Sequence, residues 1–418
     1  MNTKRIVNEK SNRIISITII LLLGICCMIS SASAAGGTGV SGDPYIITNA
    51  TELQAMNSDL TAYYALGNNI DLTGVTWTPI GATGTPFLGN FDGNGYTISK
   101  LVISSTTDSN YGLFGVCGSG TQITNFVMDD CSITGTNSSV GLLVGYVVMS
   151  SSVHDTMTIE DITIQNCDVD VNLTGDLRGS CVIGYINGYA DVECNHILVV
   201  DCNFVSASGN IVGGIVGFVI TNSTVRFSDC QVNGSIISAS GNYVGGIVGY
   251  VSTNSTVTVS GIGNVMIENC EISSASGTTV GGIVGYVTTN STVTVTGVGL
   301  NENVISASGA IVGGIVGYVH TNSTSNVISC DVENSVIKGS DSVGGVIGRV
   351  YGATVEAGSI GNVYDCTVHW CTIVGSSSYV GGVIGKVEKS TYSVDATVVS
   401  ASCIKGTGYV SGILGGMV

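Results

Sequence analysis

The stretch Val244-Gly245-Gly246-Ile247-Val248-Gly249-Tyr250 contains the pattern that decides the fold. It joins β-branched residues to glycines, and it returns throughout the chain. Copies of its first six residues lie at 212–217, 244–249, 280–285, 312–317, 343–348 and 380–385. Weaker copies end at Gly115, Gly145, Gly184 and Gly415, so that successive final glycines are 30 to 39 residues apart. Self-similarity at such a period is typical of a solenoid, a propeller or another repeat array.

The residues between two motifs predict strands. In one repeat, residues 244–251, 256–259 and 265–272 are apolar and rich in β-branched side chains, and Ser, Asn and Gly separate them. No window shows a helical period. The Asn-Gly hairpin signal of a propeller blade is nearly missing. We therefore predict an all-β, right-handed parallel β-solenoid with about three short strands in each coil of about 33 residues.

Alternation along the motif strand predicts which side chains face outward. The position after the last glycine is aromatic in six copies and becomes Arg349 and Lys386 in two later ones, and unpaired cations are almost never fully buried. This position should face outward, whereas Ile215 and its equivalents should face the core. The glycines would leave room inside or let a neighbouring strand approach closely. The outward aromatic residues are Tyr146, Tyr185, Phe218, Tyr250, Tyr286 and Tyr318.

Composition excludes several classes of protein. The 418 residues include 60 Gly and only 3 Pro, and 44% are hydrophobic, which argues against disorder. Lys and Arg number 12 against 29 Asp and Glu, for a net charge of −17. Such a chain would repel phosphate backbones and anionic lipids, so we expect no nucleic-acid partner.

The N-terminal residues predict export. Four cations lie within residues 4–13, an uncharged apolar run covers 14–29, and Ala32-Ser33-Ala34 follows. This order is typical of a signal peptide over residues 1–34, so we expect an extracellular protein without membrane insertion after its removal. Residues 35–110 would form an N-terminal capping module and 111–418 the repeats. Asn49-Ala50-Thr51-Glu52 predicts a short capping helix that runs through Met56.

The motifs resemble the GLUG repeat of bacterial surface proteins and the adhesin-like proteins of methanogenic archaea. The N-terminal segment resembles their leader module in the runs 42–47, 51–53, 66–72 and 91–98, which read GDPYII, TEL, LGNNIDL and FDGNGYTI. The resemblance covers residues 43–418. It implies a β-helical extracellular protein with an adhesive role and no defined active site to carry over.

Cysteines recur at one repeat position. In-register residues of parallel strands keep their Cβ atoms about 4.8 Å apart, which is beyond the usual disulfide range. We therefore expect a buried ladder of free thiols that behave as small apolar residues. Cys366 and Cys371 are the best pair for a disulfide, the alternative that an exported protein invites. The ladder comprises Cys131, Cys167, Cys202, Cys230, Cys270, Cys330, Cys366 and Cys403.

Two sets of surface residues are candidates for modification or binding. Thr-Asn-Ser-Thr recurs four times and contains the N-glycosylation acceptors Asn222, Asn254, Asn290 and Asn322, and other acceptors are Asn49, Asn137, Asn172 and Asn233. Asn would also favour the turn after the motif strand. The outward aromatic column is a candidate face for sugars, although its rings could instead stack on each other.

The leading prediction is a secreted or cell-surface adhesin-like protein with a structural or binding role, whose partners are glycans or cell-surface proteins. We expect no catalytic residues, cofactor or metal. Asp129-Asp130 could be read as a glycosidase pair, but Asn or Asp precedes the ladder cysteine in six copies, which indicates a repeated turn. The main alternative is a β-helical polysaccharide lyase or hydrolase. A third is an ice- or mineral-binding rod, suggested by Thr-Val-Thr-Val at 256–259 and 292–295.

Overall fold

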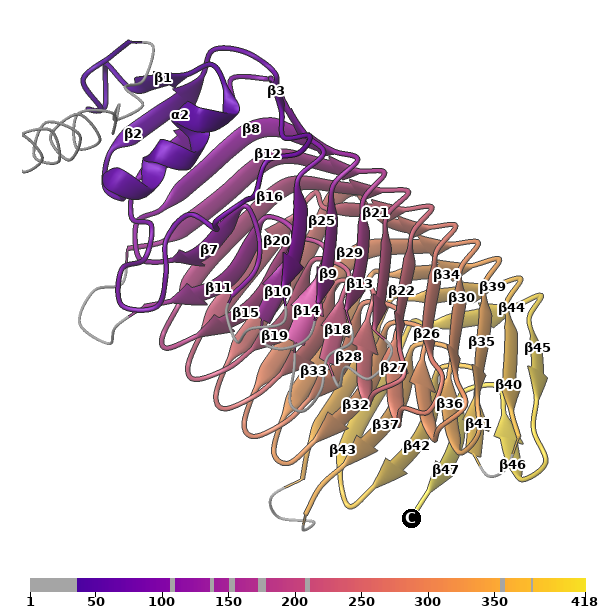
Figure 1. Cartoon of the computed structure of the whole chain (residues 1–418). Helices are drawn as coiled ribbons and strands as arrows, with labels where there is room; N and C mark the ends of the chain where they lie inside the picture. The colour runs from indigo at the N-terminus through magenta and orange to yellow at the C-terminus, as the bar shows by residue number, and fades with distance from the viewer. Residues whose placement is uncertain are drawn as a thin grey trace, which may run out of the picture.

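The computed structural model describes residues 36–105, 110–135, 139–149, 155–171, 178–206, 211–353, 358–376 and 379–418. Throughout these residues the chain winds in stacked coils whose neighbouring strands are parallel, so the predicted parallel β-solenoid is confirmed (Figure 1). Residues 1–34, the expected signal peptide, lie outside the described residues. Among the described residues, no helix has the length and apolar character needed to cross a membrane.

One coil illustrates the architecture. In chain order it contains β20 (Thr224–Ser228), β21 (Gln231–Asn233), β22 (Ile236–Ala239), β23 (Tyr243–Gly245) and β24 (Val248–Val251). The strands β20 and β21 lie in one sheet, and β22, β23 and β24 each belong to another. This coil therefore has five strands instead of the three expected. They belong to four sheets, which we number in this order.

The first sheet has 18 strands and is the broadest face of the rod. Its members are β1 (Tyr45–Ile47), β2 (Tyr63–Leu66), β3 (Ile70–Asp71), β4 (Asn90–Asp92), β5 (Thr97–Ser99), β8 (Gln122–Asp129), β12 (Met157–Gln165), β16 (Asp191–Val200), β20, β21, β25 (Thr256–Glu268), β29 (Thr292–Asn301), β33 (Thr324–Ile328), β34 (Asp331–Glu333), β38 (Ile360–Tyr364), β39 (Thr367–His369), β43 (Thr391–Asp395) and β44 (Val398–Ser400).

The other three sheets complete the cross-section. The second consists of β6 (Val102–Ser105), β9 (Ser132–Gly135), β13 (Asp168–Val171), β17 (Asn203–Ser206), β22, β26 (Glu271–Ser274), β30 (Val304–Ala307), β35 (Val336–Gly339), β40 (Thr372–Gly375) and β45 (Cys403–Lys405). The third consists of β10 (Ser139–Gly141), β14 (Arg178–Ser180), β18 (Ile211–Gly213), β23, β27 (Thr279–Gly281), β31 (Ile311–Gly313), β36 (Ser342–Gly344), β41 (Tyr379–Gly381) and β46 (Tyr409–Ser411). The fourth consists of β7 (Phe114–Cys117), β11 (Val144–Val148), β15 (Ile183–Asn187), β19 (Val216–Val219), β24, β28 (Val284–Val287), β32 (Val316–His320), β37 (Ile347–Tyr351), β42 (Ile384–Glu388) and β47 (Leu414–Met417).

The glycine motif forms a corner and is not a single strand. The chain bends at Gly246 and Ile247, between β23 and β24. A Cβ atom at Gly246 would collide with the carbonyl oxygen of Gly282 on the next coil, and one at Gly249 would lie 2.6 Å from the carbonyl oxygen of Val212 on the preceding coil. Close approach of the coils thus requires glycine. Ile247 is fully buried, as predicted for the core column.

Two further bends divide most coils, and both use backbone with positive φ. The first bend, inside the first sheet, is formed by Asn125, Asp161, His196, Asp229, Gly297, Ser329, Asp365 and Ala396. The second bend, between the first and second sheets, is formed by Lys100, Asp130, Asn166, Asp201, Gly234, Asn269, Glu302, Asn334, Trp370 and Ala401. Asn and Asp tolerate this conformation better than most residues. The Asp or Asn that precedes six of the eight ladder cysteines is therefore a bend residue.

The Thr-Asn-Ser-Thr repeats form the corner between the fourth and first sheets. The first Thr and the Asn of each copy have positive φ, and the Ser side chain is buried. The amide of Ser223 donates to Oγ of Ser255 (3.3 Å), that of Ser255 to Ser291 (3.2 Å), that of Ser291 to Ser323 (3.1 Å) and that of Ser323 to Ser359 (3.3 Å). We call this column of buried hydroxyls the serine ladder.

The N-terminal end carries the predicted helix, α2 (Ala50–Ala55), followed by a 3-10 turn, η1 (Met56–Ser58). The Asn49 side chain accepts from the amides of Thr51 and Glu52, which makes it the N-cap. Glu52 accepts from the amide of Thr48, one residue earlier than a standard capping box. The helix lies at the end of the rod beside β2, and buried Leu53 joins the core (Figure 1).

Candidate functional site

The outward aromatic residues form one continuous stack on the fourth sheet. Tyr146 and Tyr185 have ring centroids 5.0 Å apart at 13°, Tyr185 and Phe218 5.4 Å apart at 20°, and Tyr250 and Tyr286 5.1 Å apart at 23°. Edge-to-face contacts join Phe218 to Tyr250 and Tyr286 to Tyr318. Most of these side chains are half-buried, and Tyr286 is only 8% exposed.

Neighbouring side chains cover the faces of these rings further. Tyr243 of the third sheet stacks on Tyr286 at 4.6 Å, and the Arg178 guanidinium lies 4.1 Å from the centre of the Tyr185 ring. A sugar would therefore meet ring edges and hydroxyl groups more readily than ring faces. This arrangement favours the stacking interpretation of the column, in which each ring pair adds about 0.5–1.5 kcal/mol.

The stack ends in a cluster of charges. Arg349 lies 5.4 Å from the Tyr318 ring, and its Nη2 is 2.6 Å from Oε2 of Glu388. Nζ of Lys386 is 2.9 Å from the same carboxylate oxygen. The two cations thus share one carboxylate on the outward face. Burial raises the pKa of Tyr318 to about 12, since little water is present to solvate a phenolate.

The four repeated N-glycosylation acceptors form a line at the serine-ladder corner. Asn222, Asn254, Asn290 and Asn322 are all exposed, whereas the serine after each is buried. Asn233 differs because it is half-buried in β21, and its Oδ1 atom is buried. Asn137 and Asn172 lie outside the described residues.

Most of the cysteines occupy two columns and not one. Cys131, Cys167, Cys202, Cys270 and Cys371 follow the second bend, whereas Cys230, Cys330 and Cys366 follow the first. Cys403 belongs to neither column, because it begins β45 and is exposed. All twelve cysteines among the described residues are free thiols and eleven are buried, so the Cys366–Cys371 disulfide is not formed.

Hydrogen bonding explains why cysteine recurs after the second bend. The amide of Cys131 donates to Sγ of Cys167 at 3.3 Å. On other coils Ser235 and Asn303 take the acceptor's place, at 3.1 Å from the Cys202 amide and 2.9 Å from the Cys270 amide. This column therefore requires a small side chain that accepts a hydrogen bond from the backbone amide of the preceding coil. The thiols supply that acceptor in addition to filling space in the core.

The two threonine columns differ in length. One column runs over four coils through Thr224, Thr256, Thr292 and Thr324. The other contains only Thr258 and Thr294, because the next coils place Arg226 and Asn326 at that position. A lattice two threonines wide, as an ice- or mineral-binding rod would use, therefore spans only two coils.

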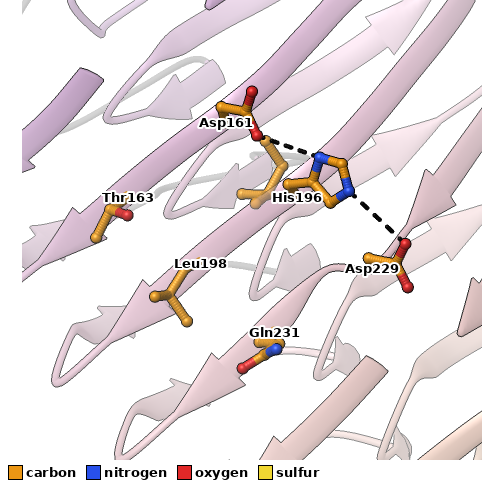
Figure 2. Close-up of a pocket in the computed structure, with 7 residues that line it drawn as sticks. Asp161, Thr163, His196, Leu198, Asp229 and Gln231 are labelled. Carbon is orange, nitrogen blue, oxygen red and sulfur yellow. Dashed lines mark ion pairs between the residues drawn. The ribbon is translucent and has the colours of Figure 1, made fainter. Parts of the chain in front are cut away.

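A groove that we did not predict from the sequence lies along the first bend. It has a volume of about 530 Å³ and is lined by Asp161, Thr163, His196, Ile197, Leu198, Asp229 and Gln231 (Figure 2). Three adjacent coils line it. They contribute β12, β16, and the bend between β20 and β21 together with the start of β21.

Three ionisable side chains of the groove, Asp161, His196 and Asp229, lie together, and Glu160 lies beside them. His196 Nδ1 lies 3.1 Å from Oδ1 of Asp161 and 4.0 Å from Oε1 of Glu160. On the opposite side of the ring, Nε2 lies 3.7 Å from Oδ2 of Asp229 (Figure 2). Three carboxylates thus surround one imidazole, which can serve as a cation or as a neutral ligand.

The members of this cluster are far apart in the chain, so no local motif reveals it. Asp161, His196 and Asp229 are separated by 35 and 33 residues. They become neighbours only because β16 pairs with β12 on one side and with β20 and β21 on the other. Alignment of the repeats on the bend residues, in addition to the glycines, would have placed these three side chains in one column.

Comparisons with known proteins give partial relatives, and no family model matches the chain. Halomucin of Haloquadratum walsbyi is 34% identical over 167 residues, which are 36% of this chain and 2% of halomucin. A protein named "Putative Gly-rich membrane protein" from Evansella cellulosilytica is 29% identical over 206 residues, 47% of this chain and 22% of that protein. The chain therefore spans only a small part of both relatives.

One solved structure aligns along most of the rod. It is the crystal structure of "a putative immunoglobulin A1 protease from Bacteroides ovatus", which matches 91% of this chain and 87% of its own with a TM-score of 0.37 and 18% identity.

Proposed function

We propose that this protein is an extracellular, surface-associated solenoid with a structural and adhesive role. The observation that carries the proposal is the line of exposed asparagines at one corner of four successive coils, held in place by the serine ladder. A parallel stack sets these groups about 4.8 Å apart. A rigid rod that repeats one group at a fixed spacing favours many weak, simultaneous contacts.

Other features support the same proposal. The net charge of −17 keeps the protein away from phosphate backbones and anionic lipids. The two partial relatives carry names of mucin and membrane-protein type, in keeping with the surface-protein family that the repeats resemble. Partners of this face would be glycans or cell-surface proteins, and the exposed asparagines would also be accessible for N-glycosylation.

The location is tested by biotinylation of intact cells of the source organism with a reagent that does not cross membranes. We expect the protein to be labelled while a cytoplasmic marker stays unlabelled. Labelling that appears only after cell lysis would refute a surface location.

The adhesive role is tested by a glycan array and a cell-binding assay with the purified protein. Changing Asn222, Asn254, Asn290 and Asn322 together to Gly removes the repeated amides and suits the positive φ. We expect a single change to weaken binding slightly and the fourfold change to abolish it, as multivalency requires. Asn334→Gly, in the second bend, is the matched control. Equal binding by the fourfold variant and this control would refute the role of the corner.

The groove favours one second candidate, a polysaccharide lyase or hydrolase. Unlike the repeated corner, the cluster of Glu160, Asp161, His196 and Asp229 occurs once in the part of the chain that the structure describes, as a catalytic centre would. Release of sugar fragments from acidic or neutral polysaccharides, lost in Asp161→Asn, would support this candidate. Under the leading proposal no fragments appear.

A further inference from the structure

We propose that Glu160, Asp161 and His196 bind a divalent transition-metal ion in the groove of the first bend, with Asp229 orienting the histidine. The site is independent of the adhesive role, since it lies at a different corner from the repeated asparagines. The ligand class follows from the donors, which are one imidazole nitrogen and two carboxylates.

The distances from the His196 nitrogen to the two carboxylates fit one shared ion. Metal–nitrogen and metal–oxygen bonds are about 2.1 Å for zinc, so two donors of one ion lie at most about 4.2 Å apart. His196 Nδ1 is 3.1 Å from the Asp161 oxygen and 4.0 Å from the Glu160 oxygen. All three donor atoms lie within 4.8 Å of one another, so small rotamer adjustments bring them around an ion.

The position of Asp229 adds an observation from a third coil. When Nδ1 of His196 binds a metal, the ring carries its proton on Nε2. That nitrogen faces Oδ2 of Asp229 at 3.7 Å. A carboxylate behind the ring is the arrangement that fixes the tautomer and raises the basicity of metal-binding histidines.

The groove leaves the ion accessible. The side chains of His196 and Asp161 are 54% and 59% exposed, so the ion can enter from solvent without any rearrangement of the coil. Three protein donors leave coordination positions open toward the groove. These positions would take water or an oxygen-bearing ligand. Imidazole as a donor favours zinc and similar ions over calcium or magnesium.

Zinc chloride is the probe, and isothermal titration is the first measurement. Exposed thiols such as Cys403 are first capped with iodoacetamide under native conditions, so that they do not bind zinc. We expect one saturable site per chain. His196→Asn should weaken zinc binding by at least about 100-fold, because it removes a donor to the ion. Asp229→Asn should weaken it by about 10-fold, because it removes only the carboxylate that orients the histidine.

Asp365→Asn is the matched control, since Asp365 occupies the same bend column and accepts from Ser329 at 3.3 Å. Asparagine suits positive φ, so all three variants should fold. We expect the control to bind zinc like the unmodified protein. Equal zinc affinity in His196→Asn and Asp365→Asn would overturn the proposal.

A second measurement uses the natural sequence and avoids any folding defect. Diethylpyrocarbonate modifies accessible imidazoles, and mass spectrometry of peptides locates the modified residue. We expect zinc to protect His196 and to leave His369, on another coil, reactive. Unchanged modification of His196 at saturating zinc would show that the four groups form only an ion-pair network.

Discussion

The serine ladder allows a sharp test of what holds the coils in register. In Ser291→Ala, the Oγ atom that accepts from the Ser255 amide at 3.2 Å is lost. Both serines are buried, at 1% and 0% exposure, so water cannot readily replace the hydroxyl. A buried donor left without a partner costs about 1–3 kcal/mol. Since 1.4 kcal/mol is a factor of ten, the Ser255 amide should exchange with solvent deuterium about 5- to 150-fold faster.

Amide hydrogen exchange resolved by NMR or by fragmentation mass spectrometry measures this effect. The Ser323 amide, which donates to Ser359, is the internal control and should be unchanged. Ser291→Cys should restore most of the protection, because Sγ of Cys167 accepts the equivalent bond from Cys131 in the second-bend column. The reasoning is refuted if the alanine variant protects Ser255 fully, or if cysteine is no better than alanine.

Three other predictions concern the packing, the thiols and the aromatic stack. Gly246→Ala should lower the free energy of unfolding by about 1–3 kcal/mol or more in chemical denaturation. Gly412→Ala, at the same motif position but with no atom near the added Cβ, should have little effect. Equal denaturation midpoints for the two variants would contradict the close approach of the coils at Gly246. Native alkylation followed by peptide mapping should modify Cys403 but not Cys270, whose pKa burial raises to about 11, and a modified Cys270 would show that the core opens. Burial favours the un-ionised Tyr318 in the folded state, so the contribution of this side chain to the free energy of unfolding is complete below about pH 10 and is lost as the pH rises to about 12. The loss of stability over this interval should be smaller in Tyr318→Phe. An identical loss in the variant would contradict the burial argument.

The repeat period predicted much of the fold. Spacing of the glycine motif indicated stacked coils, and alternation correctly directed Ile247 inward and Tyr250 outward. It could not show that the motif is a corner, because a strand and a bent strand share the same run of β-branched residues and glycines. The close contact of Gly246 with the next coil decides this point.

Local sequence therefore determined the period, the parallel stacking, the helix cap at Asn49 and the direction of most side chains. Each depends on residues a few positions apart, whose geometry the backbone fixes. Only the tertiary structure decided which coils place which side chains beside one another. Coil lengths vary between motifs, and a one-residue difference moves a side chain to another column or to the other face. That is why the cysteines separate into two columns, the tyrosine faces cover each other, and His196 lies between carboxylates from the coils on either side.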